Sequence, residues 1–197
     1  MHQYHFEEGN RKSIYLIISI VSILLAYLLY IFVFMHIYIP WWVETPSILG
    51  IFGFLIWIYK IFLWNKFPFS YLSFTKIPDL NGEWKVIIES SFDNFQNTNG
   101  KAYIKQNAYS MNICLETKNS KSFSEFIEIR NGNDNQSFDI IYTYINKPKS
   151  KAKSTMEIHT GTVHLTTNIH LTNLDGYYYS GRGRKNFGDI HFIKDLV

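Results

Sequence analysis

Residues 14–39 read IYLIISIVSILLAYLLYIFVFMHIYI, an apolar stretch without a single Asp, Glu, Lys or Arg. A helix of about 20 apolar residues is long enough to cross the hydrocarbon core of a bilayer. The polar side chains within the stretch, such as Ser19 and Ser22, can return their hydroxyl hydrogen bonds to helix carbonyls. The stretch therefore predicts a transmembrane helix over residues 14–39.

A second apolar run covers residues 48–63 and is interrupted only by Lys60, whose long side chain lets its ammonium reach the membrane interface. The segment between the two runs is too short to fold as a domain. We therefore expect residues 1–66 to form a transmembrane hairpin with helices at about 14–39 and 48–64. A cleaved signal peptide is the alternative, but the first run is too long and no small-residue cleavage site follows it.

The basic residues around the two runs predict the orientation of the hairpin. Arg11 and Lys12 precede the first run, and Lys60 and Lys66 lie at the end of the second. The connecting segment has no basic residue and one acidic residue, Glu44. By the positive-inside rule, both termini and the domain that follows the hairpin lie in the cytoplasm of a multi-pass membrane protein.

The hydrophobic period changes to two after residue 80. In GEWKVIIE, residues 82–89, Trp84, Val86 and Ile88 alternate with charged side chains, which is typical of a strand with one buried face. Further runs of strand character cover residues 101–106, 109–117, 123–130, 137–146, 156–165, 174–182 and 189–194.

These runs predict an all-β domain. Turn-rich segments such as 97–100 and 131–134 separate consecutive runs, and no helical period follows residue 80. We expect a linker over 67–79 and a small eight-stranded up-and-down β-barrel over 80–197, because closure leaves no free strand edge. A two-sheet sandwich is the alternative. An eight-stranded barrel has an interior that side chains fill or that holds one small ligand.

Alternation along the strands assigns side chains to the barrel interior. Trp84 points inward with the apolar face of its strand, and the lumen is more polar than a filled core requires. The other side chains expected to point inward are Tyr142, Tyr144, Asn146, His159, Tyr178, Ser180 and Arg182.

Arg182 is the charged member of this set. A guanidinium inside a barrel is costly unless an anion meets it. Two readings remain open at this point: an internal carboxylate partner, or a bound anionic ligand.

Other features of the sequence exclude several classes of function. His159, His164, His170 and His191 lack the spacing and acidic partners of a metal site, so we expect no metal. No catalytic nucleophile motif, phosphate-binding loop or acid–base pair is visible, so we expect no enzyme and no cofactor. Cys114 is the single cysteine, which excludes an internal disulfide.

The charge balance is mild. The chain carries 19 Lys and Arg against 16 Asp and Glu, a formal net charge of +3. This excess is too small for a surface that coats nucleic acid, so we expect no DNA or RNA polymer as a partner.

Several short motifs of the β-domain occur in a recognisable order. They are LNGEW at 80–84, YxNxP at 144–148, HxG at 159–161, LxGxYxSxR at 174–182 and GxIxF at 188–192. Together with the membrane hairpin, this order resembles the two-transmembrane β-barrel effectors of CBASS, the cyclic-oligonucleotide-based antiphage signalling systems of bacteria. The resemblance covers nearly the whole chain.

The resemblance implies an antiviral effector of the bacterial inner membrane. Its barrel would bind a cyclic dinucleotide made by a cognate CD-NTase, a nucleotidyltransferase active after infection. The residues that would bind this ligand are the inward side chains Trp84, Tyr142, Tyr144, Asn146, His159, Tyr178, Ser180 and Arg182. Binding would drive self-association and disruption of the membrane lipid, which kills the infected cell (abortive infection). Two other classes stay open: a membrane-anchored lipocalin-like module that binds an apolar small molecule, and a membrane enzyme, disfavoured by the lack of an acid–base pair.

Overall fold

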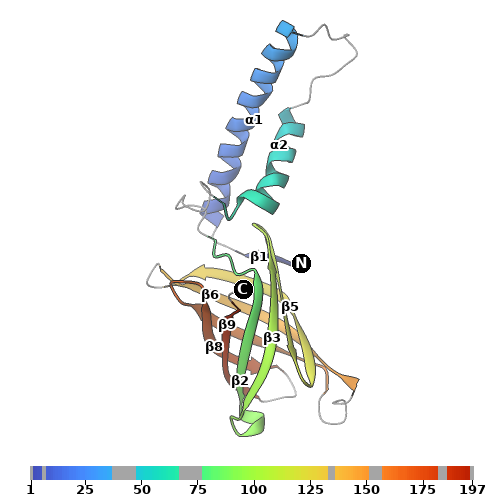
Figure 1. Cartoon of the computed structure of the whole chain (residues 1–197), viewed down its shortest axis with the longest axis vertical. Helices are drawn as coiled ribbons and strands as arrows, with labels where there is room; N and C mark the ends of the chain where they lie inside the picture. The colour runs from blue at the N-terminus through green and yellow to red at the C-terminus, as the bar shows by residue number, and fades with distance from the viewer. Residues whose placement is uncertain are drawn as a thin grey trace. The chain divides into compact units, whose positions relative to one another are not determined.

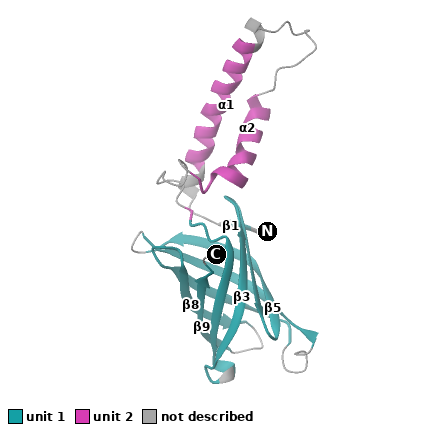
Figure 2. Ribbon diagram, in the orientation of Figure 1, with its two compact units in different colours: residues 1–6, 78–197 teal, residues 7–77 magenta. Residues whose placement is uncertain are grey.

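The computed structural model describes residues 2–5, 8–36, 48–66, 77–132, 136–150, 157–181 and 186–195. The chain divides into two compact units, coloured separately in Figure 2: residues 1–6 with 78–197, and residues 7–77. The β-rich unit is therefore built from two separate pieces of the chain. In this it differs from the expected division into a hairpin over 1–66 and a barrel over 80–197.

The helical unit contains α1, Glu8–His36, and α2, Ile48–Ile58, which continues as the π-helical segment η1, Tyr59–Leu63. Within α1, the stretch Lys12–Phe32 of 21 residues is long and apolar enough to cross a membrane. The second apolar helix, Ile48–Leu63, is shorter. Among the described residues, length and composition thus support one crossing helix where two were expected, and residues 37–39 of the first predicted span lie outside the described part.

The side chains of α1 suit an apolar surrounding. The hydroxyls of Ser19 and Ser22 donate to the carbonyls of the residues four positions earlier, at 2.7 Å and 2.6 Å, as expected for serines in a membrane helix. Ile14 and Ile18 are buried, whereas many large apolar side chains of the helix are exposed. These exposed side chains are Tyr15, Leu16, Ile20, Val21, Ile23, Leu24, Leu25, Tyr27, Leu28, Leu29, Tyr30, Ile31 and Phe32.

The β-rich unit is a closed barrel (Figure 1). Each strand from β2 to β9 pairs antiparallel with the next, and β9 pairs with β2 from Trp84↔Lys194 to Ser90↔Gly188. This confirms the up-and-down barrel and rules out the sandwich. The strands are β2 Gly82–Ser90, β3 Asn97–Gln106, β4 Ser110–Thr117, β5 Ser120–Asn131, β6 Phe138–Pro148, β7 His159–Thr167, β8 Asn173–Ser180 and β9 Phe187–Lys194.

In the part of the chain that the structure describes, the barrel has nine strands, so the prediction of eight is wrong by one. The extra strand is β1, His2–His5, which precedes α1 in the chain. β4 and β5 pair directly at 114–116 with 121–123, and β1 fills the gap between them. β1 runs antiparallel to β4 and parallel to β5. Its Tyr4 is fully buried and donates its hydroxyl to the carbonyl of Ala108 at 2.8 Å.

The end of the barrel where β2 begins is filled by large apolar side chains. Trp84 and Phe192 are fully buried and meet edge to face, with ring centroids 6.5 Å apart. The indole N–H of Trp84 donates to the carbonyl of Leu80 at 3.0 Å. The amide of Gln106 accepts from the Leu80 N–H at 3.0 Å and donates to the Pro78 carbonyl at 2.9 Å. The incoming chain is therefore fastened to this end with its polar groups satisfied.

Candidate functional site

The other end of the barrel, where β2 ends and β9 begins, holds a cavity of about 210 Å³. Every strand from β2 to β9 contributes lining side chains, from Ile88 on β2 to Ile190 on β9. Phe92 and Asn119, which belong to the turns at this end, also line the cavity and are exposed. The cavity is thus part of the lumen and opens at the turns.

β6 supplies one wall of the cavity. Tyr142, Tyr144 and Asn146 alternate along the strand and point inward, with exposed fractions of 3%, 8% and 6%. Burial raises the pKa of the Tyr142 hydroxyl well above its usual value, and the neighbouring Tyr144 raises this pKa further. Tyr142 is therefore a neutral hydroxyl, which can donate and accept hydrogen bonds but carries no charge.

β7 places an imidazole beside this wall. His159 Nδ1 lies 2.9 Å from the carbonyl oxygen of Glu157. Because a carbonyl only accepts, Nδ1 carries the hydrogen, and Nε2 is the acceptor when the ring is neutral. The His159 and Tyr144 rings meet edge to face with centroids 6.4 Å apart. Gly161 follows on the same face, and a Cβ there would collide with the Tyr144 hydroxyl, so glycine makes room for this tyrosine.

β8 continues the polar lining with Tyr178 and Ser180, which are both partly buried. The backbone N–H of Ser180 donates to the Asn186 carbonyl at 2.7 Å, and the N–H of Gly181 donates to the Thr160 carbonyl at 2.7 Å. These bonds fix the end of β8 against β7 and against the beginning of β9. Arg182, which follows Gly181, lies outside the described residues.

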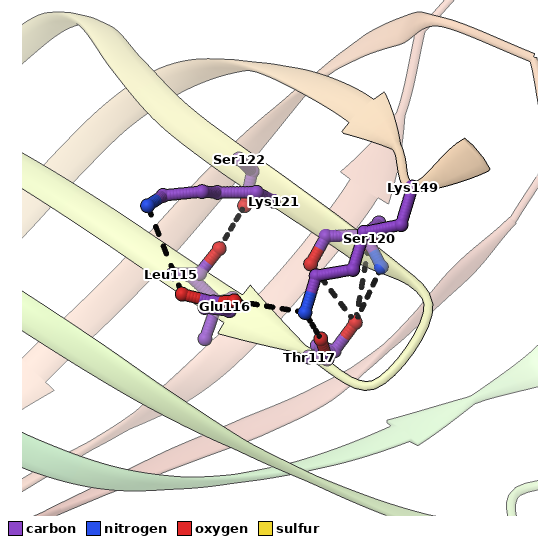
Figure 3. Close-up of polar contacts among 7 residues, drawn as sticks. All are labelled: Leu115, Glu116, Thr117, Ser120, Lys121, Ser122 and Lys149. Atoms are coloured by element: carbon purple, nitrogen blue, oxygen red, sulfur yellow. Dashed lines mark hydrogen bonds and ion pairs between the residues drawn. The ribbon is translucent and has the colours of Figure 1, made fainter. Parts of the chain in front are cut away.

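A wall of hydroxyls comes from β4 and β5 (Figure 3). Thr117, Ser120 and Ser122 line the cavity. Thr117 Oγ1 accepts from the Ser120 N–H at 3.1 Å and lies 3.1 Å from Ser120 Oγ. Ser122 Oγ is 3.4 Å from the Leu115 carbonyl, which can accept its hydrogen. The sequence prediction missed this wall.

A pattern in the sequence could have revealed these residues. Ser120, Ser122 and Ser124 occupy alternate positions of β5 and are all buried, and larger side chains separate them. Small polar residues on the inward face of a barrel strand leave space and hydrogen-bonding groups in the lumen. The predicted strand began at residue 123 and so excluded the first two serines.

The structure brings most of the expected site residues together. Trp84 does not line the cavity: it lies in the apolar core at the opposite end, with its N–H bonded to Leu80. Its inward direction is as expected, but alternation assigns a face and not a height along the barrel axis. The six expected residues that do line the cavity are Tyr142, Tyr144, Asn146, His159, Tyr178 and Ser180.

The described lining residues include no Asp, Glu, Lys or Arg. The cavity instead offers aromatic faces, hydroxyls, an imidazole and the amides of Asn119, Asn146 and Asn186. Such groups stack against planar rings and hydrogen-bond to ring edges or to anionic oxygens. The described part of the cavity can therefore hold a polar aromatic ligand.

The histidines are distributed over both faces of the barrel wall. His164 lies on the outer face and stacks on Tyr177 with ring centroids 5.0 Å apart. His191 Nδ1 is 2.7 Å from a carboxylate oxygen of Asp175, also on the outer face. Within the described ranges, no three His, Cys, Asp or Glu side chains gather to hold a metal ion.

Comparison with known proteins shows which proteins this chain is similar to. Residues 75–194 match the Cap15 cyclic dinucleotide receptor domain. A CD-NTase-associated protein 15 of Yersinia aleksiciae is 27% identical over 145 residues, which cover 73% of this chain and 69% of that protein. A second protein of that name, from Escherichia albertii, is 23% identical over 147 residues, covering 72% of this chain and 75% of that protein.

The matched residues include the whole of β2 to β9 and every strand that lines the cavity. The resemblance to the CBASS effectors, drawn from the motifs, is confirmed. The chain belongs to the family of Cap15 cyclic dinucleotide receptor domains.

Proposed function

We propose that this chain is a membrane-tethered receptor that binds a cyclic dinucleotide in the barrel cavity, self-associates and disrupts the bacterial inner membrane. The observation that carries the proposal is a lumen of tyrosines, amides and hydroxyls in a barrel of this receptor family. The messenger would come from a cognate CD-NTase, since both related proteins carry CD-NTase-associated in their names.

The chemistry of the cavity suits both parts of such a ligand. Tyr142, Tyr144 and Tyr178 offer rings on which bases stack, and Asn146 can recognise a base edge. Phosphate oxygens accept hydrogen bonds, which the hydroxyls of the β4–β5 wall can donate. Arg182 is our proposed partner for a phosphate, because a guanidinium fork matches phosphate oxygens.

The barrel's two-piece construction supports the proposed membrane topology. Residues 2–5 and 78–195 belong to one barrel, so they lie on the same side of any membrane. The chain between them therefore crosses the bilayer an even number of times. If α1 crosses, the chain must cross back, and Ile48–Leu63 is the apolar helix available for this. Its 16 residues rise by about 24 Å, short of a hydrocarbon core of about 30 Å, a mismatch that thinning of the bilayer accommodates.

Self-association follows from a ligand-dependent equilibrium. The occupied barrel would present a surface that the empty barrel does not. Barrels tethered in one plane are concentrated relative to bulk solution, so weak contacts are enough to cluster them. Clustering would crowd the apolar helices, whose exposed side chains could then disturb the lipid.

The test uses the full chain in lipid nanodiscs and in dye-filled liposomes of bacterial lipid. Cyclic di-AMP, cyclic di-GMP, cyclic GMP–AMP and uridine-containing cyclic dinucleotides are titrated by calorimetry, with the linear dinucleotides as controls. We expect at least one cyclic form to bind and to release the dye. Binding of an apolar probe in place of every nucleotide would favour the lipocalin-like module instead.

Topology is tested separately with alkaline phosphatase fusions in a bacterial host. We expect a fusion after Trp42 to be active in the periplasm and a fusion after Val197 to be inactive. The opposite pattern would end the model of a cytoplasmic receptor, because a periplasmic barrel cannot meet a cytoplasmic messenger.

A further inference from the structure

Lys149 follows the last residue of β6 and fastens this end of β6 to the turn between β4 and β5. Its backbone N–H donates to the carbonyl of Asn119 at 2.8 Å. Asn119 lies in the turn and lines the cavity. A backbone bond therefore joins two connections that the sequence separates by about thirty residues.

The side chain of Lys149 holds the same turn through Glu116, which lies between the cavity-lining residues Leu115 and Thr117 and so points away from the lumen. Figure 3 shows these contacts. Its Nζ donates to the Thr117 carbonyl at 2.8 Å and lies 2.8 Å from Glu116 Oε1. Lys121 approaches the other carboxylate oxygen less closely, at 3.7 Å. The pKa of Glu116 is lowered, first by the hydrogen bond from Lys149 and then by the charges of Lys149 and Lys121.

The inner side of this turn carries two hydroxyls of the cavity. The Thr117 carbonyl accepts the hydrogen bond from the Lys149 ammonium, while the Thr117 side chain lines the lumen. Thr117 Oγ1 bonds the Ser120 backbone and approaches Ser120 Oγ, so the two hydroxyls are held as a pair. Fixing the Thr117 carbonyl therefore also fixes where this hydroxyl pair lies.

We propose that Lys149 is a positioning residue of the binding cavity: from outside the barrel it holds the β4–β5 turn so that Thr117 and Ser120 meet the ligand. The inference rests on the proposed function and adds to it a residue that does not line the cavity. The Lys149 side chain is 42% exposed, and exposed ion pairs contribute little to stability. Its loss should therefore appear in ligand affinity and hardly in unfolding.

The experiment compares Lys149→Met with Lys121→Met in the full chain in nanodiscs. Both variants remove an ammonium beside Glu116. Of these two ammonium groups, it is the one of Lys149 that donates to the Thr117 carbonyl. Using the cyclic dinucleotide that binds the wild-type chain, we expect about fivefold weaker binding for Lys149→Met, the order of one ordinary hydrogen bond. Lys121→Met should stay within about twofold, and Lys149→Arg should restore most of the affinity, since its guanidinium keeps the donors.

A double-mutant cycle separates positioning from a general effect of charge. If Lys149 acts through the turn hydroxyls, Lys149→Met should have no further effect on affinity once Thr117→Val and Ser120→Ala are present. Additive losses, or equal losses for Lys121→Met and Lys149→Met, would overturn the inference while leaving the receptor function intact. A wild-type chain that binds none of the cyclic dinucleotides would instead contradict the proposed function, and with it the role of Lys149.

Discussion

The two ends of the barrel use the same strands for different purposes. At the end where β2 begins, which we call the closed end, inward positions carry Trp84, Phe192 and other large apolar side chains that are fully buried. At the open end, the same inward alternation brings in tyrosines, serines and Asn146 around about 210 Å³ of space. The difference teaches that this small barrel separates a filled core from a polar cavity along its axis.

The barrel interior changes from a filled core to an open cavity because the inward side chains become smaller along the axis. Along β5, Ile127 and Ile129 are inward and buried near the closed end, whereas Ser120 and Ser122 occupy the inward positions at the cavity. Serine has little volume, so space remains in the lumen beside the tyrosines of β6 and β8. Substitutions at the two ends should therefore affect different observables.

The largest effect should come from the closed end. Trp84→Ala removes a fully buried indole, and we expect it to lower the free energy of unfolding by about 3–5 kcal/mol. Denaturant unfolding of the full chain in detergent measures this loss. Tyr142→Phe is the matched control at the open end, where stability should change little. Equal losses for the two variants would break the comparison between the ends.

Gly161→Ala should damage recognition most. A Cβ at this position would collide with the Tyr144 hydroxyl and with the backbone carbonyl of Tyr179. Tyr144 must then move within the lumen, and we expect at least about tenfold weaker cyclic dinucleotide binding together with a moderate loss of stability. Thr162→Ala, at the next position of β7, is the control. Unchanged affinity in the folded Gly161→Ala protein would show that the placement of Tyr144 does not matter.

Asn146→Ala tests the polar lining and disturbs the packing of the cavity wall less than Gly161→Ala does. Asn146 is 6% exposed and lines the cavity, so it can meet a base or phosphate away from competing water. We expect the free energy of binding to become less favourable by about 1–2 kcal/mol, the range for a buried hydrogen bond that loses one of its two partner groups. Titration calorimetry with the cognate ligand measures the change. A melting temperature that falls while affinity is retained would assign Asn146 a purely structural role.

The smallest effect concerns the extra strand. Tyr4→Phe keeps the buried ring and removes the hydroxyl that donates to Ala108. We expect a loss of about 1 kcal/mol in unfolding free energy and little change in affinity, because β1 does not line the cavity. Hydrogen exchange of the β1 amides is the sensitive measurement. A large loss of affinity would mean that the two ends of the barrel are coupled through β1.

Much of the fold could be predicted because apolar and polar residues alternate along the strands of a closed barrel, and this alternation is visible in the sequence. The runs from residue 82 to 194 correspond to β2 through β9 in order, and the apolar N-terminal helix was also expected. β1 could not be found this way: HQYH is four residues long, contains no alternation of apolar and polar residues, and depends on partners far along the chain.

The site was predictable where one strand carried a regular pattern. Inward placement of Tyr142, Tyr144 and Asn146 follows from their spacing along β6. The height of a side chain along the barrel axis depends on strand tilt and register, which a single sequence does not reveal. Alternation therefore predicted the inward direction of Trp84 but not that it lies at the other end from the cavity. Whether Arg182 contacts a ligand stays a prediction, as do the ligand roles of the residues around the cavity.

The placement of β1 also has a consequence for biosynthesis. Tyr4 bonds to Ala108, which follows it by 104 residues, so β1 leaves the ribosome well before its partners β4 and β5 have been made. Meanwhile the apolar helices α1 and α2 emerge and can enter the membrane. β1 must then dock against two strands synthesised much later, which makes its docking a late step of folding.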